Sequence, residues 1–172
     1  MQPIRWLAAC VVAALAAHAV YRLAWQPFRC NIVKNRVQRV AFGIFDLPNS
    51  PTVARKARQA IADIQPCVAA CPTDVDMYMT LAMNDRVIGR LQHAADMYGQ
   101  ALKYDRRPEI YFNIGMVQLE MNQRDAALAT LTKACSFSIE YADDIPDPTL
   151  RDTVVSAVRA QQERGIAEAR RK

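Results

Sequence analysis

The sequence predicts an all-α protein, a short array of helical hairpins behind one apolar N-terminal helix. One observation is that the stretch from Tyr78 to Ala134 repeats itself at a distance of 33 residues, and a period of this size is typical of stacked helical repeats. Another is that the stretch from Trp6 to Ala17 contains no charged and no strongly polar side chain. The chain has 172 residues, of which 52% are hydrophobic and 23% are charged. This is the composition of one globular domain of ordinary size.

Residues 1–25 have the layout of a transmembrane anchor or a signal peptide, because Arg5 precedes the apolar run. A helix from Trp6 to Trp25 would be about 30 Å long, enough to span the hydrocarbon core, with an aromatic residue at each interface. This favours a retained single span in a bacterial inner membrane. Two alternatives stay open: cleavage at the small-x-small site Ala17-His18-Ala19, and a buried soluble helix.

The net charge of +5 lies near the N-terminus. Residues 1–60 hold nine basic side chains against one acid, Asp46, while the remainder holds thirteen bases and sixteen acids. The basic side chains of residues 22–58 therefore favour an anionic lipid surface as a partner, or else form a solvated helix face. Nucleic acid is disfavoured because aromatic interleaving and a reading motif are both missing.

The side of the membrane on which the repeats lie is left open by the sequence. Basic residues after the apolar segment favour the cytoplasmic side, whereas a signal-like amino terminus favours export.

Three segments are predicted in order, and residues 1–25 are the first. Residues 26–50 form a basic, membrane-proximal helix and linker, with helical spacing up to Phe45 and a cap at Ser50. Residues 51–172 form the helical domain, which opens with a helix from Pro51 to Gln65 that Pro66 interrupts. The hairpin helices are expected at residues 75–87 and 91–104, and then at 108–121 and 124–136. A helix at 148–165 is expected to cap the open end of the stack.

The repeat itself consists of six matched pairs, which are Tyr78 and Tyr111, Leu81 and Ile114, Ala82 and Gly115, Ala94 and Ala127, Tyr98 and Leu131, and Ala101 and Ala134. In each copy the first three residues share one helical face and the last three share another. Gly89 or Asn122 lies between them as the turn. Each copy is therefore predicted to be a helical hairpin, in which the small residues let the two helices approach closely.

This pattern resembles the tetratricopeptide repeat family, in which a bulky aromatic and a large-then-small pair precede alanine, a bulky residue and alanine in a second helix. The resemblance covers about two full repeats. A half repeat precedes them at Ala60, Ile64, Cys67 and Pro72, while the prolines expected after the full repeats are replaced by Arg106 and Ile139. The resemblance implies a binding scaffold for a protein or peptide partner.

In the family that the sequence resembles, the first helices of successive hairpins line a concave groove. The corresponding residues here are Met79, Met83, Arg86, Phe112, Asn113, Met116 and Leu119. Asn113 falls where some family members hold a peptide backbone, but two methionines replace the residues of a carboxylate clamp. A methionine-rich groove suits an amphipathic helix or an extended apolar peptide. The alternative is that the chain's own helices cover these residues; if they do not, we expect Phe112→Ala to lose the partner without loss of folding stability.

The sequence predicts no catalytic, cofactor or metal site. Cys67 and Cys71 are four residues apart but lack a second pair and a neighbouring histidine, so buried free thiols are favoured. If the domain is exported, Cys30, Cys67, Cys71 and Cys135 allow two bridges. The predicted function is a membrane-anchored protein-binding adaptor and not an enzyme. The alternatives are an exported structural repeat protein and a small enzyme with an unrecognised site.

Overall fold

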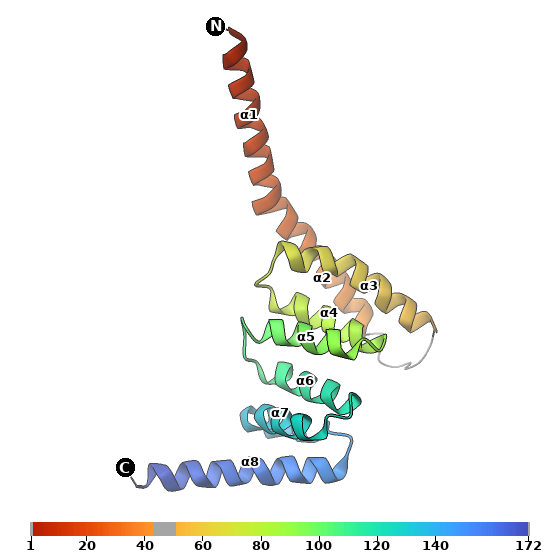
Figure 1. The fold of residues 1–172 in the computed structure, drawn as a ribbon, viewed down its shortest axis with the longest axis vertical. Helices are drawn as coiled ribbons and strands as arrows, with labels where there is room; N and C mark the ends of the chain where they lie inside the picture. The colour runs from red at the N-terminus through yellow and green to blue at the C-terminus, as the bar shows by residue number, and fades with distance from the viewer. Residues whose placement is uncertain (1, 43–50, 172) are drawn as a thin grey trace.

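The computed structural model describes residues 2–42 and 51–171, and every regular element within these ranges is helical. The all-α prediction is therefore confirmed for the described residues. One helix projects from one end of the molecule, the following helices are stacked, and the last helix lies across the other end (Figure 1).

The N-terminal helices follow one another without a loop. They are α1 (Gln2–Val20), a π-helical segment η1 (Tyr21–Trp25) and α2 (Gln26–Phe42). Pro27 accounts for the widened turn, because its ring displaces the carbonyl group of Leu23 four residues earlier. Five aliphatic side chains in the described part of α1 and η1 are more than half exposed; they are Val11, Val12, Leu15, Val20 and Leu23.

Within the described residues, no helix combines the length and the apolar character that crossing a membrane requires.

The second helix belongs to the packed body, whereas the sequence predicts a helix and linker beside the membrane. α2 packs on α3 (Pro51–Ala70) and also contacts α4 (Val75–Val87). Cys30 and Val37 are buried in these contacts, and Lys34 Nζ lies 2.9 Å from a carboxylate oxygen of Asp74 at the start of α4. The predicted turn and the cap at Ser50 lie outside the described residues.

The third helix continues through the proline at which we expected a break. α3 ends at Ala70, beyond Pro66. Its buried residues lie on one helical face and flank the proline on both sides; they are Val53, Ala57, Ala60, Ile61, Ile64 and Cys67. A proline inside a helix costs about 3 kcal/mol, and burial of this continuous apolar face offsets that cost.

Two helix pairs follow, near the predicted positions. α4 pairs with α5 (Leu91–Ala101), and α6 (Pro108–Glu120) pairs with α7 (Arg124–Phe137). The turns match: Gly89 has a φ of 77° and Asn122 a φ of 59°, both in the left-handed region that glycine and asparagine tolerate best. α5 ends three residues earlier than expected, after Ala101.

The interiors of the two pairs contain the residues that the repeat pattern selects. Ten of these twelve are buried, and Tyr111 and Ile114 are partly buried; the ten are Tyr78, Leu81, Ala82, Ala94, Tyr98, Ala101, Gly115, Ala127, Leu131 and Ala134. The closest approach is at Gly115, where a Cβ atom would lie 2.6 Å from Leu131 Cγ. The second pair therefore depends on the absence of a side chain at this position.

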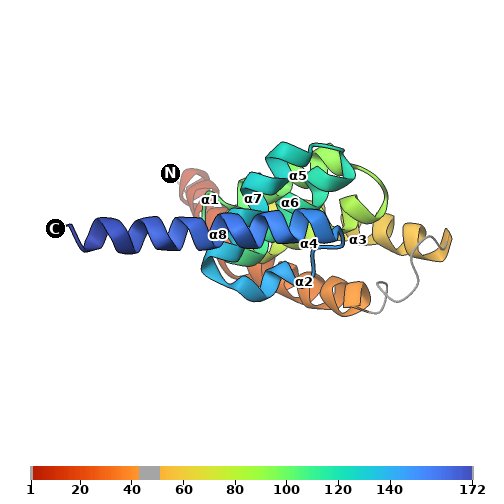
Figure 2. The ribbon, with the colours of Figure 1, turned by 90° about the horizontal axis from the view of Figure 1, so that it is seen from below.

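The last helix covers the end of the stack with only its first half. α8 (Pro148–Ala169) follows a short 3₁₀ segment, η2 (Ile139–Ala142). Leu150, Val154 and Val158 pack into a cluster that includes Leu131 of α7. Beyond Val158 the helix is exposed and extends past the stack (Figure 2).

Asp147 fixes the start of α8 in two ways. Its side chain accepts a hydrogen bond from the backbone N–H of Leu150 at 3.0 Å and another from the guanidinium group of Arg124. These two interactions, with the bond from Arg124 as the larger cause, hold the pKa of Asp147 below its ordinary value of 3.8. A group with a lowered folded-state pKa stabilises the fold above its unfolded pKa, and that stability is lost as the pH falls through the folded pKa.

We therefore expect Asp147→Asn, which keeps a capping side chain but removes the charge, to lower the Tm at pH 7. The difference from the wild type should shrink as the pH falls below 3.8, measured by thermal unfolding at a series of pH values. Asp144→Asn in the same loop, where the side chain is exposed, is the control and should change little. A difference that stays constant down to pH 2 would contradict this role of the Asp147 charge.

Candidate functional site

The seven residues assigned to a partner-binding groove lie on α4 and α6, and all are partly buried. Met79 and Met83 pack against the cluster that holds Tyr98 and Ile110. This cluster combines residues of α4, α5 and α6, so the two methionines pack where the first helix pair meets the second.

On α6 the equivalent side chains lean on the C-terminal elements in the same way. Phe112 and Leu119 pack against the cluster formed by α7, η2 and α8. The ring centroid of Phe112 lies 5.3 Å from that of Tyr141. Because one face of the Phe112 ring packs against these elements, Phe112→Ala should lower folding stability. The sequence led us to expect no loss of stability in this variant.

The polar residues of the predicted groove differ in their pairing. The guanidinium group of Arg86 donates to Glu120 Oε1 at 2.6 Å, which joins the C-terminal end of α4 to that of α6. Asn113 and Met116 are partly exposed on α6. Met83 and Met116 occupy equivalent positions 33 residues apart, and both residues are partly exposed on the first helices of the two pairs.

A second surface feature is formed by aromatic pairs that the six matched positions of the repeat do not include. The ring of Tyr78 stacks on that of Tyr104 with centroids 6.2 Å apart, and Tyr111 stacks on Phe137 at 6.0 Å. The outer rings of both pairs are exposed, by 49% for Tyr104 and 54% for Phe137. These two residues are themselves 33 positions apart, so the period would have revealed them had the comparison included the ends of the second helices.

A buried acidic residue joins the two helices of the first pair. The side chain of Asp85 is fully buried, and one of its oxygens lies 2.6 Å from His93 Nδ1. A carboxylate only accepts hydrogen bonds, so Nδ1 carries the proton and Nε2 faces away from the pair. The other oxygen has no hydrogen-bond partner among the described residues, and the nearest cation there, Arg90 Nη1, is 3.8 Å away.

Two of the cysteines in the described residues form a bridge. Cys30 of α2 and Cys67 of α3 are disulfide-bonded with Cα atoms 5.2 Å apart, which corrects the expectation that Cys67 is a free thiol. Cys71 and Cys135 are free, and burial raises the pKa of the Cys135 thiol, so this thiol is unreactive. Among residues 2–42 and 51–171, no group of three or more His, Cys, Asp and Glu side chains is placed to hold a metal ion.

Comparison with known proteins assigns no family. No family model matches the chain, and no curated protein matches it.

Proposed function

We propose that this protein is an adaptor that holds a protein or peptide partner on the surface formed by α4 and α6 of a short tetratricopeptide-like array. Support comes from the two successive helix pairs, which share their turns, their buried small residues and their stacked aromatic pairs. Arrays of this kind expose equivalent positions of successive helices on one side and use them as an extended binding surface.

The observation that carries this proposal is the alignment of Met83 with Met116. Flexible thioethers adapt to apolar partners of varied shape, and these two are partly exposed at equivalent positions of neighbouring helices. Asn113 lies one helical turn before Met116, and its amide group has the donors and acceptor that a peptide backbone requires. An amphipathic or extended apolar segment is the partner that this surface suits best.

We also propose that the N-terminal helix holds the protein at a membrane. The support is the row of exposed apolar side chains on α1 and η1, among them Val12, Leu15 and Leu23. Such a surface is rarely left in water. Because α1 continues through η1 into α2, and α2 is bonded to α3, the helical body would be held in a fixed orientation to the membrane surface.

The bridge between Cys30 and Cys67 favours the exported side. Disulfides persist in oxidising compartments and are rare in the cytosol. It supports the argument for export that the signal-like amino terminus gives, against the argument from the basic residues. We propose that the repeats lie outside the cytoplasm.

Intact-mass measurement under non-reducing conditions on protein from native membranes tests both location proposals. The mass should include residues 1–19 and should be two hydrogen masses below that of the fully reduced chain, because one bridge is closed. A mass lacking the first nineteen residues would favour instead an exported soluble repeat protein, for which Ala17-His18-Ala19 is the cleavage site. A fully reduced mass would contradict the exported location.

Partner binding is tested by Met116→Glu. A charge on an apolar binding surface should reduce recovery of the partner about thirtyfold, the effect of about 2 kcal/mol at a binding hot spot. Recovery is measured by crosslinking in native membranes followed by affinity purification. Circular dichroism and Tm should remain near those of the wild type, since Met116 is partly exposed. Gln161→Glu on the exposed half of α8 is the matched control and should leave recovery unchanged; equal recovery from both variants would overturn the proposal for this surface.

A further inference from the structure

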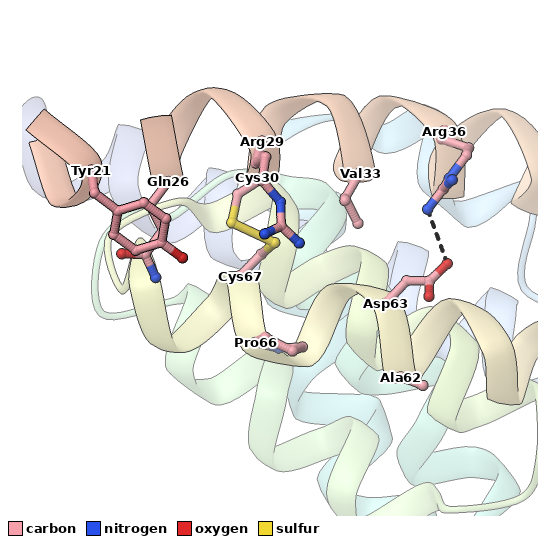
Figure 3. Close-up of a pocket in the computed structure, with 10 residues that line it drawn as sticks. All are labelled: Tyr21, Gln26, Arg29, Cys30, Val33, Arg36, Ala62, Asp63, Pro66 and Cys67. Carbon is pink, nitrogen blue, oxygen red and sulfur yellow. Dashed lines mark hydrogen bonds and ion pairs between the residues drawn. A yellow bond between two sulfur atoms is a disulfide. The ribbon is translucent and has the colours of Figure 1, made fainter. Parts of the chain in front are cut away.

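A cleft lies along the seam between α2 and α3, close to the point where α1 leaves the body (Figure 3). Its volume is about 300 Å³, at the lower end of the range for small-molecule sites. Tyr21 and Gln26 line one end, Arg36 and Asp63 line the other, and the bridge from Cys30 lies between them. The two walls are therefore covalently joined, which fixes the width of the cleft.

The two arginines in this cleft are not equivalent. Arg36 Nη2 lies 3.3 Å from a carboxylate oxygen of Asp63, so these charges largely compensate each other. The side chain of Arg29 points from α2 toward α3 beside the bridge, and it has no ion-pair partner among the described residues. The cleft thus contains one uncompensated positive charge.

The wall opposite Arg29 offers an acceptor. Pro66 has no N–H group, so the carbonyl group of Ala62, four residues earlier, loses its hydrogen-bond donor within α3. Both residues line the cleft. At the other end, the Tyr21 hydroxyl and the Gln26 amide are neutral groups that donate and accept. The cleft therefore combines one free cation with neutral donors and an acceptor.

We propose that this cleft binds a phosphate ester that carries a hydroxyl or amino group, with Arg29 on the phosphate. Guanidinium groups match the geometry of phosphate oxygens and bind them with two parallel hydrogen bonds. The Ala62 carbonyl group accepts from the hydroxyl or amino group of the ester. A phospholipid headgroup and a soluble phosphate ester share this chemistry.

The position of the cleft favours the lipid as the source, and this part rests on the proposed function at a membrane. The exposed apolar side chains of Val20 and Leu23 follow directly along α1 and η1, where acyl chains of a bound lipid would lie. Arg29 would thus be the one basic side chain of residues 22–58 for which this inference assigns a specific contact with a lipid headgroup.

The test compares Arg29→Gln with Arg58→Gln in the full-length protein. Arg58 is exposed on α3 and does not line the cleft, so the two variants lose the same charge. One arm measures retention of phosphatidylglycerol or phosphatidylcholine by native mass spectrometry from detergent, and the other measures binding of glycerol 3-phosphate by calorimetry. Arg29→Gln should weaken phosphatidylglycerol binding about tenfold or more, as expected for the loss of a hydrogen bond to a charged group, and Arg58→Gln less than about twofold.

If Arg29→Gln weakened binding of glycerol 3-phosphate but not binding of the lipid, the site would be supported and its ligand would be a soluble ester. Equal losses in the two variants, or no loss in Arg29→Gln, would overturn it. Crosslinking to the partner from the α4 and α6 surface should be unchanged in Arg29→Gln, so failure of this inference and failure of the adaptor proposal are separate results.

Discussion

Gly115→Leu should lower the free energy of unfolding by about 3 kcal/mol, the upper end of the usual cost of overpacking. Even a Cβ atom at this position would lie 2.6 Å from Leu131 Cγ and 3.4 Å from the Leu131 backbone nitrogen. Leu131 is fully buried, so it has no space into which to move. The measurement is chemical denaturation of this variant and the wild type, followed by circular dichroism.

Gly99 provides the matched control, since it is also a helical glycine, in α5. A Cβ atom there meets nothing within 4 Å. Gly99→Ala should stabilise the protein by up to about 1 kcal/mol, the difference in helix propensity, while Gly115→Ala should destabilise it. If both alanine variants were equally stable, α6 and α7 would not pack at Gly115 as described.

His93→Ala should lower the free energy of unfolding by about 3 kcal/mol, because it leaves the buried carboxylate of Asp85 without its hydrogen-bond donor. The side chain of Asp85 has no exposed surface, and its other oxygen already lacks a hydrogen-bond partner among the described residues. The loss of stability therefore arises from a buried carboxylate without a hydrogen-bond donor. The loss of the imidazole ring itself contributes little, because the His93 side chain is 44% exposed.

Two further variants separate these causes in the same unfolding experiment. Arg90→Ala should cost less than about 1 kcal/mol, since the Arg90 side chain is 60% exposed and lies 3.8 Å from the carboxylate. The double variant Asp85→Leu with His93→Ala should recover part of the stability lost in His93→Ala, because no buried charge remains. Equal stability of His93→Ala and the wild type would contradict the pairing.

The helical hairpins were predictable because their packing depends on residues that recur at one spacing. Ala82 and Ala94 are buried in one cluster of the first pair, and Gly115 and Ala127 lie at the same places in the next, so local sequence contains the pattern. The turns were predictable for the same reason, since Gly89 and Asn122 are residues that adopt a positive φ.

The place of α2 was not predictable from a local pattern. Its decisive contacts join residues far apart in the chain, with 37 positions between the bridged cysteines and 40 between Lys34 and Asp74. Helical periodicity reports which face is apolar but not which helix covers it. The basic side chains of α2 also suggested a solvated helix, although one of them is used in an ion pair with α4.

The candidate site was only partly predictable for a related reason. Position along the repeat identified which faces of α4 and α6 could form the groove. Whether the Phe112 side chain is accessible there depends on its contact with Tyr141, which lies beyond the repeat. The pairing of Asp85 with His93 was missed because the pattern was searched for shared apolar residues, and this polar pair occurs only in the first copy.

Site-specific photo-crosslinking tests the central claim most directly. A photo-reactive amino acid is placed at Met83, at Met116 or at Gln161 in the full-length protein, and the products formed in native membranes are identified by mass spectrometry. The account predicts that the two methionine positions label the same partner protein, through one continuous segment of it, and that Gln161 does not. Labelling of that partner from Gln161 alone, or of unrelated proteins from Met83 and Met116, would contradict it.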